Sequence, residues 1–288
     1  MASTLRELYD VMKASLGVEG LEIPLTAVKI YKSGEEVPEA VRAHQIPELT
    51  LTSCQACRQA ALGDPVCLTK ENIGCVAAAI SLGFVSPQDS HPLEGPRVYT
   101  EIMRKQAEAE EAFVPPSPKD FTDGIVYACK EAGRPDFSLF GREDSGRYRD
   151  VQTAKQAVGA MASIAPPTTQ AVFLYPFDFE QEDLLPDVVV LSVRPVELTR
   201  LIQAHQYVTG RPTEAVMGAL RVVCSDLIAR PYMTKRINIA TYCLGARLMA
   251  KYEAERLGLA VPYMIFKEII DGLKRSKTGY PFHLYPGV

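Results

Sequence analysis

The sequence has no tryptophan, no long hydrophobic run and no excess of basic residues. Its longest apolar stretch, residues 75–85, is far shorter than the ~20 residues that a membrane-spanning helix needs. The 31 Lys and Arg residues are outnumbered by 35 Asp and Glu residues, which gives a formal net charge of −4. The short apolar stretch means that a membrane is not an expected partner. The charge balance excludes a basic surface over the whole molecule, so nucleic acid is not an expected partner either.

The N-terminal segment also lacks the pattern of a secretory signal. Thr4 and Glu7 form a capping-box motif, and apolar residues at helical spacing follow, so we expect a helix over residues 5–16. We therefore expect a cytoplasmic protein, in which cysteine thiols stay reduced.

Common catalytic and nucleotide-binding motifs are missing as well. The sequence contains no Gly-x-Gly-x-x-Gly, Walker, His-Glu-x-x-His or Gly-x-Ser-x-Gly motif. Arg58 follows Cys57 where a c-type haem motif would have histidine. The histidines are isolated in the sequence, which favours surface or hydrogen-bonded side chains over metal ligands; they are His44, His91, His205 and His283.

Strand and helix patterns alternate along the chain. They predict an α/β or α+β fold with a mixed sheet and flanking helices. The expected strands cover residues 23–31, 48–52, 65–69, 170–175, 187–193, 237–242 and 261–265. The expected later helices cover residues 53–63 (capped by Ser53), 72–82, 97–113, 197–207, 216–228, 243–257 and 267–275.

Two proline-containing breaks predict three regions. They are an N-terminal half over residues 1–113, a connecting region over 114–165 and a C-terminal half over 166–288. Each half contains a pair of cysteines at similar spacing, with the second cysteine opening a helix; the pairs are Cys54 and Cys75, and Cys224 and Cys243. This pattern suggests two structurally related halves, although cysteine is also common in buried positions.

The seven cysteines are the most informative residues. Four of them lie within 22 residues, in the pattern Cys54-x2-Cys57-x9-Cys67-x7-Cys75. Four thiolates suffice for a tetrahedral zinc site or a cubane iron–sulfur cluster, but the spacing is not the doubled Cys-x-x-Cys of a zinc ribbon. Cys67 in an expected strand and the isolated Cys129 could equally be core residues.

Short motifs around these cysteines resemble domain-of-unknown-function family 169, also called ArCR, which is common in anaerobic archaea and bacteria. The motifs are Pro24-Leu-Thr-Ala-Val-Lys-Ile30, Cys54-Gln55-Ala56, Glu71-Asn72-Ile-Gly-Cys75, Cys224-Ser-Asp226 and Tyr242-Cys243-Leu-Gly-Ala-Arg247. The resemblance covers residues 5–90 and 166–275. It implies that Cys54, Cys75, Cys224 and Cys243 are the family's motif cysteines, whereas Cys57 and Cys67 are additions. The association with anaerobes favours iron–sulfur over zinc by analogy only.

The first hypothesis is a cytoplasmic redox protein with an iron–sulfur cluster of the 4Fe–4S type. Cys54, Cys75, Cys224 and Cys243 would hold the cluster, and Cys57 would be a fifth, exchangeable thiol. Arg58 and Arg247 would hold an anionic small-molecule substrate, although surface ion pairs explain both arginines equally well. The expected partners are this substrate, an electron-transfer partner and a second copy in a homodimer. Whether the protein is an enzyme stays open.

Three other hypotheses remain. A structural zinc site would use Cys54, Cys57, Cys67 and Cys75. A metal-free protein would bind a small organic molecule in a pocket lined by tyrosines and apolar residues. A thiol enzyme would use Cys75 or Cys243, whose pKa a helix N-terminus would lower.

Overall fold

A computed structural model describes residues 4–16, 23–46, 51–85, 160–165, 168–179, 181, 184–218 and 221–276. The predicted helix at 97–113, the proline-rich break, Cys129, His91 and His283 lie outside these residues. The helices are α1 (Leu5–Leu16), α2 (Glu39–Arg42), α3 (Ser53–Ala61), α4 (Val76–Ser81), α8 (Pro195–Thr209), the π-helix η2 (Val222–Ala229), α9 (Arg230–Thr234), α10 (Leu244–Ala250) and α11 (Tyr263–Arg275). The strands are β1 (Leu25–Lys32), β2 (Val66–Leu68), β3 (Thr169–Tyr175), β4 (Val188–Val193), β5 (Asn238–Thr241) and β6 (Leu257–Pro262).

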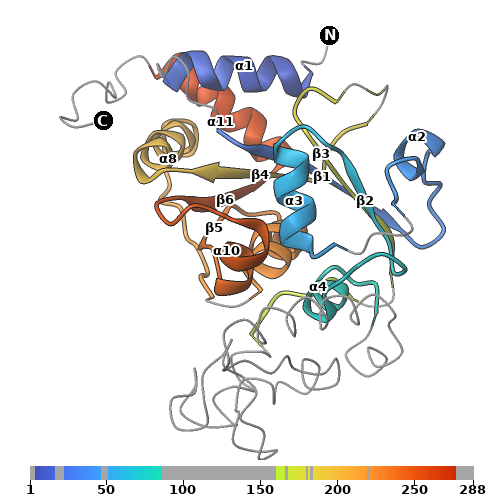
Figure 1. The fold of residues 1–288 in the computed structure, drawn as a ribbon. Helices are drawn as coiled ribbons and strands as arrows, with labels where there is room; N and C mark the ends of the chain where they lie inside the picture. Colours follow the sequence, from blue (N-terminus) through green and yellow to red (C-terminus); the bar gives the residue numbers. More distant parts are fainter. Residues whose placement is uncertain are drawn as a thin grey trace, which may run out of the picture. The chain divides into compact units, whose positions relative to one another are not determined.

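The strands form one six-stranded sheet in the order β2-β3-β1-β4-β6-β5 (Figure 1). Strand β4 lies between β1 and β6 and is antiparallel to both, with Val189 opposite Ala27 on one side and Val261 on the other. Every residue of β4 is buried, as its continuous apolar sequence predicts. The sheet with its helices confirms the predicted fold class in its α+β form.

One face of β4 and β6 is covered by helices. Val189, Leu191 and Val193 alternate along β4 and join one hydrophobic core with residues of α1, α8 and α11. In Figure 1, α11 runs below α1, and α8 lies beside it. Helices α8 and α11 approach so closely at Gly272 that a Cβ atom there would lie 2.1 Å from the carbonyl oxygen of Ala204.

The opposite face of β6 packs against the π-helix η2. Gly258 lies next to Leu259 along β6 and therefore points away from the helical core. A Cβ atom at Gly258 would lie 2.3 Å from Cδ1 of Leu227, so glycine makes room for the η2 side chain. The fully buried η2 thus forms the second layer on this sheet.

Several predicted elements differ in extent. The predicted helix at 243–257 ends with α10 at Ala250, and Leu257 already belongs to β6. The apolar segment from Val216 is irregular up to Gly218, and its helix begins only at Val222. The predicted strand at 261–265 is wrong in its bounds, because β6 covers Leu257–Pro262 and α11 begins at Tyr263.

The chain forms two compact units. Unit 1 contains Met1–Ile30, Cys57–Val66 and Phe173–Val288, and unit 2 contains Tyr31–Ala56 and Cys67–Val172. Both units draw residues from both predicted halves, and the internal duplication stays a prediction. Within the ranges given above, no helix is long and apolar enough to cross a membrane.

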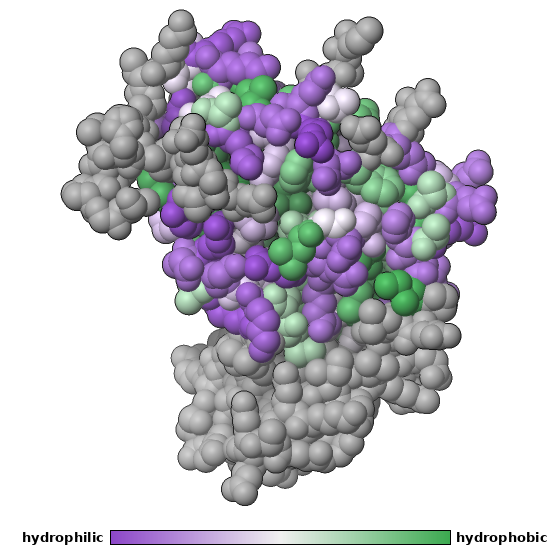
Figure 2. Space-filling view, turned by 45° about the horizontal axis from the view of Figure 1, so that its top comes forward, coloured by the Kyte–Doolittle hydropathy of each residue, from purple (hydrophilic) through white to green (hydrophobic). Residues whose placement is uncertain are grey.

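On the face drawn in Figure 2, hydrophobic residues occur in small groups between hydrophilic ones. The large apolar side chains of the described residues are mostly buried, and only nine remain exposed. Several of these nine, including Val208, Val216 and Met264, lie close in sequence to residues that line a cavity of unit 1.

Candidate functional site

Two motif cysteines of unit 2 follow neighbouring backbone segments. Leu51 and Ile73 form a parallel bridge, with hydrogen bonds from Leu51 N to Asn72 O and from Gly74 N to Leu51 O. Gly74 allows this approach, because a Cβ atom there would lie 3.3 Å from the Leu51 carbonyl carbon. Leu51 precedes α3 by two residues and Ile73 precedes α4 by three, so paired backbone segments lead into both helices.

Cys54 and Cys75 occupy these two helix starts. Cys54 is the second residue of α3, and Cys75 is the N-cap of α4. Both are half-buried, and neither is in a disulfide. The predicted cap at Ser53 is wrong by one residue: Thr52 Oγ1 accepts the Gln55 N–H at 3.2 Å, and Gln55 Oε1 accepts the Thr52 N–H at 3.0 Å. Thr52 Oγ1 also accepts a hydrogen bond from the Cys54 thiol at 3.5 Å.

The second pair of motif cysteines belongs to unit 1. Cys243 is half-buried and is the N-cap of α10, where its carbonyl accepts the Arg247 N–H at 3.1 Å. Cys224 is buried on η2, and its thiol donates to the carbonyl of Arg221. Cys75 and Cys243 thus share one local geometry: an extended residue whose carbonyl takes the first helical hydrogen bond.

The two additional cysteines have a different environment. Cys57 and Cys67 are 2% and 0% exposed. Burial raises the pKa of the Cys57 thiol, although hydrogen bonds from Tyr252 and Thr26 and the charge of Arg58 oppose it. Burial raises the pKa of Cys67 to about 11. Both side chains are therefore protonated thiols at neutral pH, whereas metal ligation and nucleophilic attack require thiolates.

The two candidate arginines converge on one segment of unit 1. Arg58 donates two hydrogen bonds to the Glu253 carboxylate, at 2.7 and 3.3 Å. Arg247 donates to the carbonyls of Tyr242 and Glu253, at 3.1 and 3.0 Å. Arg58 forms an ion pair, as the alternative interpretation expected, but its side chain is only 18% exposed.

The residues that complete this cluster were missed in the sequence. Tyr242 and Tyr252 stack with ring centroids 3.9 Å apart, and Arg58 lies 5.6 Å from the Tyr252 ring centroid. Burial raises the pKa of Tyr242. In the sequence, only their closeness to Cys243 could have indicated Tyr242 and Tyr252, because Arg58, which contacts Tyr252, lies far away along the chain.

A set of three or more His, Cys, Asp or Glu side chains arranged for a metal ion does not occur within the described residues. Unit 2 brings the segments of Cys54 and Cys75 together, and unit 1 contains Cys57, Cys224, Cys243, Arg58 and Arg247. The Cys54 and Cys75 environments fit thiolate ligation better than those of Cys57 and Cys67 do.

Comparison with known proteins decides the family. Residues 18–272 match domain-of-unknown-function family 169, described as uncharacterised ArCR. The chain belongs to this family. The ArCR assignment confirms the resemblance drawn from the cysteine motifs. An uncharacterized protein of Methanocaldococcus jannaschii, MJ0308, is 22% identical over 275 residues, which cover 95% of this chain and 96% of that protein. No solved structure matches this ArCR chain.

Proposed function

We propose that this ArCR protein binds an iron–sulfur cluster through cysteine thiolates and uses it in a redox reaction of a small molecule in the cytoplasm. The proposed ligands are Cys54, Cys75, Cys224 and Cys243. The observation that supports the proposal most is the parallel bridge between Leu51 and Ile73, which pairs the backbone segments that lead to Cys54 and Cys75. Bound, such a cluster would accept or donate single electrons.

The local chemistry at these cysteines supports thiolate ligation. The partial positive charge at a helix start stabilises a thiolate, and Cys54 and Cys75 lie at the starts of α3 and α4. They are half-buried, so a metal could reach them. Burial and raised pKa values at Cys57 and Cys67 favour the motif cysteines over the alternative zinc site on Cys54, Cys57, Cys67 and Cys75, and the proposal therefore leaves Cys57 out of its ligands.

The experiment compares metal content between cysteine variants. The full-length protein is purified without oxygen, and iron, zinc, acid-labile sulfide and the visible spectrum are measured. Cys54→Ser and Cys75→Ser should each lose most of the iron, the sulfide and the visible absorbance. Cys57→Ala is the matched control, because it alters the same helix but removes no proposed ligand.

Two results would overturn the proposal. The first is zinc without sulfide in the wild-type protein, which would support the structural zinc site. The second is wild-type protein that contains neither iron nor zinc, which would support a protein without a metal. Far-ultraviolet circular dichroism of each variant separates loss of the cluster from loss of the fold.

A further inference from the structure

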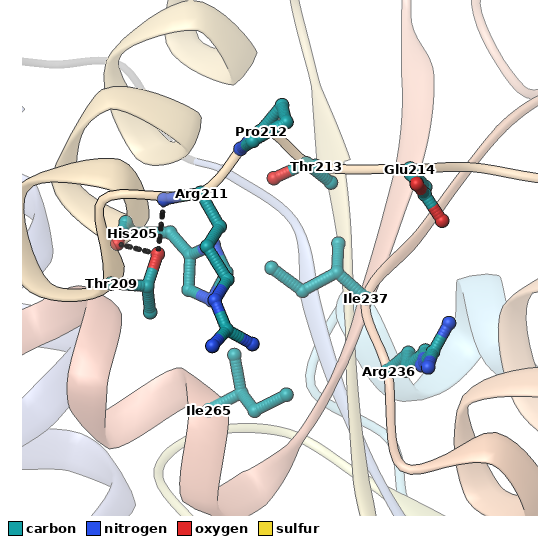
Figure 3. A pocket seen from close by; sticks show the side chains of 9 residues that line it. All are labelled: His205, Thr209, Arg211, Pro212, Thr213, Glu214, Arg236, Ile237 and Ile265. Atoms are coloured by element: carbon teal, nitrogen blue, oxygen red, sulfur yellow. Dashed lines mark hydrogen bonds between the residues drawn. The ribbon is translucent and has the colours of Figure 1, made fainter.

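Unit 1 contains a cavity of about 640 Å³ that none of the motif cysteines lines. The cavity lies between the C-terminal end of α8, the segment that follows it, the residues before β5 and the start of α11 (Figure 3). Its lining residues are His205, Thr209, Arg211, Pro212, Thr213, Glu214, Arg236, Ile237 and Ile265. The volume is in the range typical of small-molecule sites.

The irregular wall of the cavity is held at both ends. After α8, Gly210 adopts a left-handed conformation with φ of 67°, which turns the chain. The Thr209 hydroxyl donates to the carbonyl of His205 at 2.9 Å and accepts the Arg211 N–H at 3.3 Å, as Figure 3 shows. At the other end, the Asn238 side chain forms two hydrogen bonds with the backbone of Val216, at 2.8 and 3.0 Å. The segment is thus fixed in place without being a helix or strand.

Two guanidinium groups of the lining have no anionic partner among the residues that the structure describes. Arg211 and Arg236 form no ion pair and no side-chain hydrogen bond with any residue that the structure describes. By contrast, Arg58, Arg194 and Arg275 each pair with a carboxylate. Among the described lining residues, Glu214 is the single acidic one beside two arginines, so these side chains carry a positive balance.

Two further polar atoms of the lining are buried, one on His205 and one on Thr213. His205 Nδ1 and Thr213 Oγ1 have no hydrogen-bond partner among the described residues. Burial lowers the pKa of His205, against the opposing charge of Glu268, so the imidazole is neutral at pH 7. A neutral imidazole and a hydroxyl can each donate to a ligand oxygen. An unsatisfied buried polar group destabilises the empty cavity, and a ligand that supplies the missing partner removes this cost.

The remaining surface of the cavity is apolar. In Figure 3 the Arg211 side chain reaches from the segment after α8 into the space near Ile237 and Ile265. Pro212 adds a third apolar group to the lining. A ligand here can therefore place a charged end at a guanidinium group and an apolar body on the isoleucines.

We propose that this cavity binds a small organic oxyanion, a carboxylate or a phosphate monoester with a compact apolar body. Arg211 and Arg236 supply the charge, His205 and Thr213 supply hydrogen bonds, and Ile237 and Ile265 contact the body. The site does not depend on a metal, and it goes beyond the cysteine-based proposal. It also differs from the predicted ligand pocket, because no tyrosine is among its lining residues. His205 in turn is part of a cavity, which its isolated position in the sequence did not indicate.

The test titrates four probes into the full-length protein labelled at isoleucine methyl groups. The probes are benzoate, phenyl phosphate, the neutral benzamide and inorganic phosphate, and the Ile237 and Ile265 methyl shifts in NMR spectra report binding. We expect benzoate or phenyl phosphate to bind at least tenfold more tightly than benzamide and inorganic phosphate. The tighter of the two organic anions identifies the carboxylate or the phosphate as the preferred head group.

Variants locate the binding site. Arg211→Gln should weaken binding of the preferred anion at least tenfold, and Glu214→Gln should leave it unchanged or tighten it. Arg275→Gln is the control, since Arg275 is exposed on α11 and does not line the cavity. The proposal is overturned if benzamide binds as tightly as the anions, if inorganic phosphate does so, if no probe moves the two methyl signals, or if Arg211→Gln binds like wild type.

Discussion

Arg58 and Glu253 are 195 positions apart in the sequence, yet their side chains meet in a two-hydrogen-bond ion pair. The pair joins α3 to the turn after α10, next to the stacked rings of Tyr242 and Tyr252. Because Arg247 binds the backbone carbonyl of the same glutamate, the turn is held from two sides. This relationship explains why α10 is short and supplies the first prediction.

Breaking the pair should lower the free energy of unfolding more at neutral pH than at low pH. Burial alone would raise the pKa of Glu253, but hydrogen bonds from its own backbone and from Arg58, with the charges of Arg58 and Arg256, lower it overall. A carboxyl with a lowered pKa in the folded state stabilises the protein above its unfolded pKa, near 4.3, and loses this contribution as the pH falls through the folded value.

Urea denaturation of Glu253→Gln at two pH values checks this expectation. The free energy of unfolding should fall by about 0.5–1 kcal/mol at pH 7, a small value because solvent screens the half-exposed carboxylate. At pH 3 the difference from wild type should shrink. Asp271→Asn, which removes an exposed pair with Arg275, is the control and should cost less. An equal difference at both pH values would contradict the ion-pair explanation.

Replacement by alanine should change the stability of the protein in opposite directions at Gly272 and Gly245. Gly272→Ala places a Cβ atom 2.1 Å from the carbonyl oxygen of Ala204, so α8 and α11 must separate, and we expect a loss of about 1–3 kcal/mol. Gly245→Ala in α10 meets only Cys243 Sγ at 4.0 Å, and alanine favours the helix by about 0.5–1 kcal/mol. Thermal denaturation of both variants checks this, since the melting temperature should fall for Gly272→Ala and rise for Gly245→Ala. A neutral Gly272→Ala would show that the helices can move apart freely.

The sequence predicts much of the fold where local signals are strong. The Thr4–Glu7 capping box marks the start of α1, and the hydrogen bonds of that box are present. The apolar run of β4 and the helix α8, which begins at Pro195 and ends before Gly210, also agree with the prediction. These elements are determined by nearby residues, so local patterns suffice to find them.

The end of α10 could not be predicted in the same way. Residues 250–256 contain good helix formers and no glycine or proline, so local propensity continues the helix. The structure ends it with Lys251 at φ of 55°, where Tyr252 stacks on Tyr242 and Glu253 reaches Arg58. These distant contacts outweigh local propensity. The cavity was missed for the same reason, since its residues come from three separate segments.

The cap of α3 provides a third prediction. Thr52, rather than Ser53, exchanges hydrogen bonds with Gln55. Thr52→Val keeps the shape but removes the hydroxyl, and we expect a loss of about 1 kcal/mol in the free energy of unfolding. Ser53→Ala should cost less, although both residues are 2% exposed. Urea denaturation of the two variants compares them, and a larger effect at Ser53 would contradict the observed cap.

The cysteines should differ in their reactivity toward iodoacetamide. Cys54, Cys75 and Cys243 are half-buried, whereas Cys57 and Cys67 are buried with raised pKa values. Alkylation requires an accessible thiolate, so the first three should react faster at pH 7.5 by at least tenfold. Short labelling pulses followed by peptide mass spectrometry measure each rate, and labelling in urea is the control in which the differences should disappear.

Repeating the labelling before and after chelation under reducing conditions adds a test of metal ligation. If Cys54, Cys75 and Cys243 hold a cluster, all three should be protected in protein purified without oxygen and should gain reactivity when the metal is removed, because coordination occupies the sulfur lone pairs. The rates of Cys57 and Cys67 should not change, since burial limits them in both states. If the alkylation rate of Cys57 rises as much as that of Cys54, Cys57 is also a ligand. This result would contradict the proposal that Cys54 binds the metal and the buried Cys57 of the same helix does not.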